Sequence, residues 1–436
     1  MSNGNALKLK PMLKKDCDLL SWVFIGVCGI FLALFLYPFL FKTAGIDKQL
    51  EIFYSRAENF MADLFNVCTY SVDRDPYYNT YGEAAEKAYF PLSYVIAFVF
   101  GRLINFDDYN GTIYSLNQFE IIGAALLLMM TSAVLAVCVY GSVGGSSVKR
   151  VLLVLAFMTS GPFIFTVERW NLILFSLIGM IVFVSTYNSE NKTIRELGYL
   201  SLAFAAALKG YPAILGLLLI YRKEWKEAIR LAIYGAVGSF GPFLLVKHGF
   251  GAIPKWLSNL KANAELYEFR AGNCSGYRFF IVGNTDLSQD QMSSMISSIQ
   301  AIVIIVSIMA VICSFFVKRD WIRIALLISL VIIMPSNSAY YNFLYYIPLV
   351  IVLIKENVKG PLEYLAAVLL AVLMMPYRIN GENWFFDMQN TIVLANVCVL
   401  VMFILSVLYC MVVGIKEILR LIRQKRGFKH GKTQPA

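Results

Sequence analysis

The sequence predicts an all-α, polytopic membrane protein, and three observations lead to that prediction. Hydrophobic residues make up 58% of the 436 residues, and the mean hydropathy is +0.65. A soluble core cannot bury that much apolar surface. The apolar residues also form long runs, while most charged residues lie in the links between them. We therefore expect a bundle of about twelve transmembrane helices with two large outer loops.

The first apolar run, residues 20–41, is long enough to cross the hydrocarbon core. No small-residue cleavage site follows it, which predicts an uncleaved anchor preceded by a cytoplasmic segment, residues 1–19. The expected outer loops are residues 42–88 and 248–292. The later runs expected to cross the membrane are residues 91–103, 119–140, 151–166, 171–187, 197–220, 228–247, 293–316, 321–335, 340–354, 361–376 and 391–414.

Lysine and arginine residues set the expected orientation in the cell membrane. Basic residues gather in 222–230, in 318–323 and in the C-terminal tail, 415–436, so these segments and both termini are predicted to be cytoplasmic. The formal charge of +10 is explained by this topology rather than by a nucleic-acid partner. Residues 141–196 fit less well, and their short polar-interrupted runs are also compatible with broken helices that line a cavity.

Cysteine and histidine usage speaks against a metal centre or a metal cofactor. The eight cysteines are scattered singly, with no CxxC, and the chain has two histidines. Cys68 and Cys274 fall in the expected outer loops, where two free thiols are favoured over a disulfide bridge. We therefore expect no cofactor.

Carboxylates and tyrosines are concentrated in the first outer loop, from Phe60 to Val95. Asp63 follows an amphipathic stretch suited to the membrane surface, where a carboxylate can take a proton from an acceptor hydroxyl. A solvated charge or a helix cap is the alternative. Asp75 belongs to a DxD triplet that is also compatible with a turn before Pro76, and the turn is favoured.

Charges inside apolar runs are costly unless they are paired, hydrated or functional. Lys209 lies within residues 197–220 and is followed by Gly210 and Pro212, which break a helix and open its backbone. This pattern predicts an anion site, and snorkelling of the lysine is the alternative. Arg169 suits a lipid phosphate, unless it pairs with its neighbour Glu168.

Two further stretches mix aromatic and polar residues. In the second outer loop, Arg270 and Arg278 stand among tyrosines and glycines, which suits a sugar or headgroup surface but also a solvated loop. Ser338, Tyr340 and Tyr341 lie at the outer end of a run; an interfacial aromatic belt explains the tyrosines but not the serine.

Short motifs follow one another in a distinctive order over most of residues 20–350. They are Asp63-Leu64, Asp75-Pro76-Tyr77, Phe90-Pro91-Leu92, Glu168-Arg169-Trp170-Asn171, Ala207-Leu208-Lys209-Gly210-Tyr211-Pro212, Pro335-Ser336-Asn337-Ser338 and Tyr340-Tyr341. This order resembles glycosyltransferase family 87, the polyprenyl-phosphate-mannose-dependent mannosyltransferases of the GT-C fold. Two features depart from the family pattern: a glutamine is replaced in the Glu168–Asn171 motif, and no histidine stands near Tyr340.

The resemblance implies a membrane glycosyltransferase that works without metal. It would move mannose, or another hexose or pentose, from a polyprenyl-phosphate donor to a lipid-linked or glycan acceptor on the outer face, with Asp63 as general base. Lys209 and Arg169 are the predicted donor-phosphate contacts. The predicted substrate-binding residues are Asp75, Tyr77, Asn171, Tyr211, Arg270, Arg278, Ser338, Tyr340 and Tyr341.

Two other classes of membrane protein remain as alternatives. An O-antigen-type polymerase or ligase would depend on outer-loop arginines such as Arg270 and Arg278 instead of Asp63. A transporter would use Lys209 and broken helices along a substrate path, but it has no evident need for a long acidic first loop.

Overall fold

The computed structural model describes residues 19–41, 60–104, 113–269, 273–284, 286–375 and 390–430. Over these ranges the chain is helical and contains no β-strand, which confirms the all-α prediction. The α-helices are α1 (Leu19–Leu40), α3 (Ala62–Ser71), α4 (Pro91–Ile104), α5 (Gln118–Ser142), α6 (Ser147–Met158), α7 (Gly161–Arg169), α8 (Ile173–Thr186), α9 (Lys192–Lys209), α10 (Leu217–Tyr221), α11 (Trp225–Phe240), α12 (Ile253–Leu266), α13 (Tyr277–Val282), α14 (Gln289–Ser314), α15 (Asp320–Ile333), α16 (Ile347–Glu356), α17 (Pro361–Leu373) and α18 (Asn390–His430). Short 3₁₀ segments are η2 (Ala84–Glu86), η4 (Ile113–Ser115), η5 (Tyr211–Gly216), η6 (Gly241–Leu245), η7 (Gly249–Ala252) and η8 (Tyr340–Tyr346).

Five helical segments in the described part of the chain are long and apolar enough to cross a membrane, namely those in α1, α5, α11 with η6, α14 and α18. A sixth is present if α6 and α7, which meet at a bend of 57°, form one span. The expected count of about twelve spans is therefore not confirmed. Several other predicted spans coincide with shorter helices such as α8, whose 14 residues extend roughly 21 Å against a hydrocarbon core of about 30 Å.

Glycine and proline interrupt α9 at the predicted place, and a further break, between α6 and α7, lies inside the predicted run 151–166. Gly210 ends α9, and Pro212 begins the 3₁₀ segment η5. Between α6 and α7, Ser160 accepts a hydrogen bond from the Phe163 backbone N–H, with Pro162 in the first turn of α7. Such breaks leave backbone groups without helical partners, which a membrane protein tolerates only beside a cavity or buried polar groups. They mark where a site can form.

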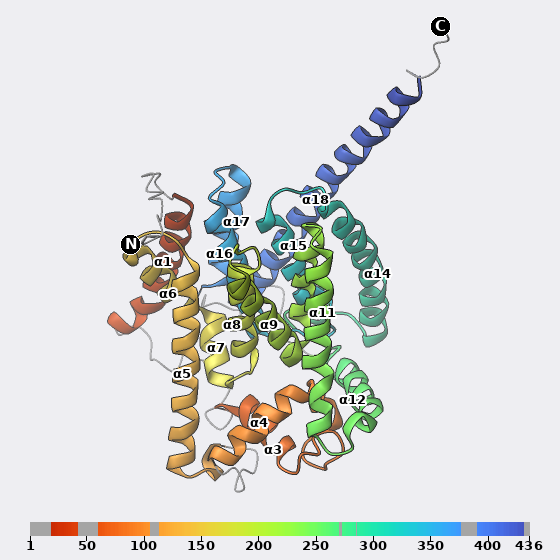
Figure 1. The fold of residues 1–436 in the computed structure, drawn as a ribbon. Helices are drawn as coiled ribbons and strands as arrows, with labels where there is room; N and C mark the ends of the chain where they lie inside the picture. Colours follow the sequence, from red (N-terminus) through yellow and green to blue (C-terminus); the bar gives the residue numbers. More distant parts are fainter. Residues whose placement is uncertain are drawn as a thin grey trace, which may run out of the picture.

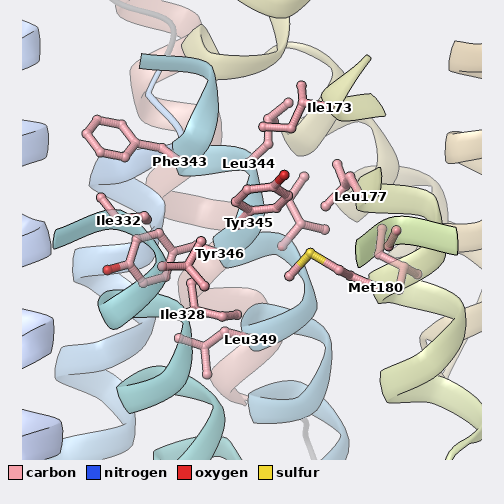
Figure 2. Packing of buried hydrophobic residues seen from close by; sticks show 14 of the residues in the cluster. Ile173, Leu177, Met180, Ile328, Ile332, Phe343, Leu344, Tyr345, Tyr346 and Leu349 are labelled. Atoms are coloured by element: carbon pink, nitrogen blue, oxygen red, sulfur yellow. The ribbon is translucent and has the colours of Figure 1, made fainter. Parts of the chain in front are cut away.

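The core between α8, α15 and η8 fixes one wall of that region (Figure 2). Tyr345 and Tyr346 are fully buried there, and Leu177 of α8 and Ile328 of α15 pack around them. The Tyr345 hydroxyl donates to Ser176 Oγ at 3.3 Å, so the polar tip of this ring is satisfied inside the core. This packing holds η8, whose residues Tyr341 and Asn342 line the cavity described below.

The described part of the predicted first outer loop, from residue 60 onward, folds back against the bundle. In Figure 1, α3, α4 and α12 gather at one end of the molecule, and α17 and the C-terminal half of α18 lie at the other. Met61 and Leu64 are 1% and 0% exposed, so the expectation that this stretch lies on the membrane surface is wrong for these residues. The reason is that α3 packs against α4 and α7 in the protein interior.

Cys68 and Cys274 are both buried, and the structure shows no disulfide at either of them.

The ends of the bundle allow a test of the predicted orientation. Lys226 lies in the first turn of α11 and Glu83 in the exposed link between α3 and α4. We expect a cysteine at residue 83 to react with a membrane-impermeant maleimide in intact cells, and a cysteine at residue 226 to react only after permeabilisation, because the basic loop is predicted to be cytoplasmic. Labelling of residue 226 in intact cells would overturn the orientation.

Candidate active site

Asp63, in the first turn of α3, has a carboxylate that accepts three side-chain hydrogen bonds. Its Oδ1 accepts hydrogen bonds from Arg169 Nε at 3.0 Å and from Arg169 Nη2 at 2.6 Å. Its Oδ2 accepts from Asn171 Nδ2 at 2.6 Å. The Asp63 and Arg169 side chains are 17% and 24% exposed, so this charge-assisted contact is largely shielded from water. Arg169 thus pairs across the fold with Asp63.

The break between α7 and α8 places both partners of this carboxylate. Trp170 adopts a left-handed conformation (φ 49°, ψ 55°), fully buried, with its indole N–H donating to the Ala124 carbonyl at 3.0 Å. The side chains on either side of it, Arg169 and Asn171, both donate hydrogen bonds to the Asp63 carboxylate. Asn171 Oδ1 also accepts from the Ile173 backbone N–H at 3.0 Å, which holds the amide in one orientation at the start of α8.

Lys209 is the last residue of α9, where a cation suits the negative end of the helix dipole. Its ammonium lies 4.5 Å from the ring centre of Tyr89 and 5.7 Å from that of Tyr341, within range of cation–π attraction. Asp63 is close enough to act on it electrostatically. Within the described ranges, however, no carboxylate forms an ion pair with Lys209. Its charge is therefore available to an anionic ligand.

A cavity of about 390 Å³ joins these groups. This size falls within the roughly 300–1,000 Å³ typical of small-molecule sites. Five of the predicted site residues line it: Asp63, Arg169, Lys209, Tyr211 and Tyr341. They come from α3, α7, α9, η5 and η8, so the cavity is built where the interrupted helices meet α3.

The cavity is also lined by residues that were not predicted from the sequence as site residues. The Tyr70 hydroxyl donates to Glu86 Oε2 at 2.5 Å, and burial together with this carboxylate raises the pKa of Tyr70. Burial and the nearby Asp63 raise the pKa of Tyr89 as well. Both tyrosines are therefore neutral donors at pH 7. Trp256 of α12 closes the wall by donating from Nε1 to the Ala88 carbonyl at 3.2 Å. For Tyr70, Glu86 and Tyr89, the only sequence signal is their position in a carboxylate-rich segment just before Phe90-Pro91.

Asp75 and Tyr77 do not line the cavity. Asp75 Oδ2 lies 3.6 Å from both Lys247 Nζ and His248 Nε2, and this contact holds the turn of the first loop to the end of η6. The Tyr77 hydroxyl donates to the Tyr89 carbonyl at 3.1 Å. These two residues support the cavity wall from behind.

The other predicted substrate-binding residues also lie behind the cavity surface. Ser338 Oγ accepts from Asn342 Nδ2 at 3.0 Å, and Tyr340 packs against the Phe165 ring with centroids 6.0 Å apart. Arg278 is buried and donates from Nη2 to Gln300 at 2.7 Å. Arg270 lies outside the described residues. No group of three or more histidine, cysteine, aspartate or glutamate side chains suited to a metal ion occurs where the structure describes the chain.

Comparison with known proteins gives one finding. A family model described as glycosyltransferase family 87 matches residues 113–336, just over half of the 436 residues. The chain belongs to glycosyltransferase family 87. No match was found among curated proteins or among solved structures.

Family membership makes the protein a membrane glycosyltransferase that acts on a sugar donor and an acceptor. The transporter and polymerase or ligase alternatives are thereby set aside. The matched range includes Arg169, Asn171, Lys209 and Tyr211 and begins after Asp63. The family match therefore does not cover Asp63, which the structure connects to the matched range through hydrogen bonds with Arg169 and Asn171.

The Gly210→Ala variant tests how the helix break places Lys209. Gly210 has φ +72°, and an added Cβ would lie 3.0 Å from Phe90 Cε2. The strained backbone alone costs about 1–2 kcal/mol. We expect a lower melting temperature and a large loss of transfer activity. Gly141→Ala in α5 is the matched control, since nothing lies within 4 Å of its Cβ position. Equal activity of the two variants would show that the break is not needed.

Proposed function

We propose that this glycosyltransferase transfers a sugar from a polyprenyl-phosphate donor to a hydroxyl of a lipid-linked or glycan acceptor at the outer face of the cell membrane. The observation that carries the proposal is that Asp63, Arg169 and Lys209 face one cavity beside interrupted helices. A carboxylate base and a cation without a carboxylate partner are the two groups needed to activate a hydroxyl and to stabilise a departing phosphate.

Asp63 is the proposed general base. A carboxylate offers about four lone-pair sites, and three are filled by the two Arg169 donors and the Asn171 donor. The remaining site is on Oδ2, and this is the atom that would take the acceptor's proton. Arg169 and Asn171 fix the direction of that lone pair before the substrate arrives, which is the kind of preorganisation that lowers a barrier.

Lys209 is the proposed contact for the donor phosphate. As the acceptor oxygen bonds to the anomeric carbon, the bond from that carbon to the phosphate oxygen breaks, and the polyprenyl phosphate leaves with the electron pair. The negative charge that develops there is compensated by the Lys209 ammonium. Arg169 is a second contact, because its pairing with Asp63 uses two of the five guanidinium N–H donors.

An apolar groove beside the cavity suits the polyprenyl chain. It has a volume of about 590 Å³ and runs between α9, η5 and α11, with many alanine and glycine residues in its walls. Phe90 and Gly210 line both the groove and the cavity, so the two spaces adjoin next to Lys209. Along α11 the groove extends from Ala228 to Phe240, roughly 18 Å at 1.5 Å per residue. A long isoprenoid fits such a path.

The assignments of the catalytic domain, the membrane orientation and the donor sugar belong to the same proposal. Residues 20–414 form the catalytic transmembrane domain, with the active site outside and both termini in the cytoplasm. Mannose is one candidate donor sugar, and other hexoses and pentoses are alternatives because the Glu168–Asn171 motif and the region of Tyr340 depart from the family pattern. The direct test is to incubate purified protein with a panel of radiolabelled polyprenyl-phosphate sugars and a membrane lipid extract. No transfer from any donor in the panel would reject the proposal.

The Lys209→Met variant tests the phosphate contact. We expect transfer to fall by roughly a hundredfold, as is typical when one preorganised charge contact is lost. Affinity for unlabelled polyprenyl phosphate, measured by competition, should fall with it. Parental transfer by a folded variant would show that Lys209 does not contact the phosphate.

The Asp63→Asn variant tests the base. The amide keeps the shape of the carboxylate but cannot take the proton, so we expect a loss of about a hundredfold to ten-thousandfold in transfer rate with donor binding nearly unchanged. Asp73→Asn is the matched control, since Asp73 is an exposed residue of the same loop outside the cavity. Asp75→Asn should lose less than Asp63→Asn and mainly through stability. If the Asp63 and Asp73 variants are equally active, Asp63 is not the base.

A further inference from the structure

The polar cavity continues past Asp63 along one face of α3. Asp63, Asn66, Val67 and Tyr70 all line it, and this spacing puts them on one stripe of the helix. Tyr70 follows Asp63 by seven positions, roughly 10 Å along the helix axis at 1.5 Å per residue. The reaction described so far uses the Asp63 end of this stripe and leaves the Tyr70 end without a role.

Glu86 lies at the Tyr70 end and lines the cavity. Its Oε2 accepts a hydrogen bond from the Tyr70 hydroxyl at 2.5 Å and one from the Glu83 backbone N–H at 3.4 Å. Gly82 permits this packing, because a Cβ there would lie 2.7 Å from Glu86 Oε2. Within the described part of the chain, the other oxygen, Oε1, accepts no hydrogen bond, and no lysine or arginine forms an ion pair with this carboxylate.

Helix α12 fixes the backbone around Glu86. Trp256, Asn259 and Asn263 recur on one face of this helix. Their side-chain N–H groups donate, at 2.7–3.2 Å, to three backbone carbonyls next to Glu86 in the chain, those of Ala85, Lys87 and Ala88. The segment that carries Glu86 is therefore bonded to a helix, and its carboxylate has a defined position before a ligand binds.

The two ends of the cavity differ in charge. Both lining cations lie near Asp63, whereas the Glu86 carboxylate has no cation paired with it in the described ranges. Lys87 follows Glu86 in the chain, but its ammonium donates to the Asn79 carbonyl at 2.6 Å. A carboxylate accepts hydrogen bonds from ligand hydroxyls and repels a ligand carboxylate. The Glu86 end therefore suits an uncharged group that carries hydroxyls.

We propose that Glu86 is a specificity-determining residue that selects an uncharged sugar on the acceptor and rejects an acidic one. The inference rests on the proposed function. With the donor phosphate at Lys209 and the acceptor hydroxyl at Asp63, the reacting carbon of the donor lies between them. The rest of the acceptor then extends along α3 toward Glu86.

The other residues at this end also suit a sugar ring. Tyr70, Trp256 and Tyr267 line the cavity together with Asn263. The Asn263 amide N–H is bonded to the Ala85 carbonyl, so its Oδ1 is left to accept from a ligand hydroxyl, as is Glu86 Oε1. Aromatic walls with a few fixed polar groups are typical of sites that orient a small polar ligand.

Binding of small sugars tests the selection without requiring transfer. The probes are the methyl glycosides of glucose, galactose and mannose, each paired with that of its uronic acid, and the full-length protein is held in lipid nanodiscs. We expect at least one neutral glycoside to bind saturably in saturation-transfer NMR, and its acidic counterpart to bind about tenfold more weakly, because like charges repel. Glu86→Gln, whose amide oxygen can still accept from Tyr70, should bring the two affinities within about threefold.

Glu83→Gln is the matched control, since Glu83 is an exposed residue of the same segment outside the cavity. This variant should keep the preference for the neutral glycoside. The proposal is overturned if the parental protein binds no neutral glycoside saturably, or if the Glu86 and Glu83 variants show the same preference.

The transfer assay tests whether the selected sugar belongs to the acceptor. With a membrane lipid extract as acceptor, we expect Glu86→Ala to raise the apparent KM for the extract about tenfold, while affinity for the polyprenyl-phosphate sugar stays within about twofold of the parental value. An unchanged KM in a folded variant, or a change confined to donor affinity, would refute the acceptor assignment. If the parental protein transfers from no donor in the panel, the proposed function fails, and the binding preference still decides whether Glu86 selects an uncharged sugar.

Discussion

Three hydrogen bonds on the Asp63 carboxylate join α3 to the break between α7 and α8, and the candidate site depends on them. Arg169 and Asn171 donate to both carboxylate oxygens, and the Met61 backbone N–H donates to the Glu168 carbonyl at 2.7 Å beside them. A partly buried carboxylate without these donors would carry a desolvation penalty of several kcal/mol. The same contacts that stabilise the loop therefore also orient the proposed base, so the two roles are coupled in these side chains.

Interrupted helices explain how polar groups come to lie inside an apolar bundle. A continuous helix satisfies its own backbone and leaves only side chains for chemistry, whereas a break ends the helix and presents its last residues to a cavity. Trp170 makes one such break through its left-handed conformation, and Gly210 makes another. Arg169 and Lys209 each stand directly before one of these residues. The fold thus places two cations at two helix C-termini, where the helix dipole favours them.

The sequence predicts the fold class and the positions of both breaks, between the runs 151–166 and 171–187 and at Gly210, because those depend on local chemistry. Composition alone requires a helical membrane protein, and Gly210 with Pro212 cannot continue a helix. The partner of Arg169 could not be predicted in this way, since Glu168 is its neighbour and Asp63 lies far away in the chain. Residue type also does not tell which residues line the cavity and which support its wall. Tyr211 and Tyr341 line the cavity, while Tyr340, the neighbour of Tyr341 in the chain, lies behind it. The expected number of spans is not confirmed, because apolar runs look alike in sequence whether they form long helices or short, broken ones.

The two cations that line the cavity, Arg169 and Lys209, have different partners. Arg169 already compensates the Asp63 charge, so binding an anion there would require the guanidinium to be shared between two negative groups. Lys209 has aromatic neighbours instead, and rings attract a cation without neutralising it. In the proposed reaction, a donor phosphate would therefore gain more from Lys209, while Arg169 keeps the Asp63 carboxylate in place. The donor could then bind without displacing the proposed base from its Arg169 partner.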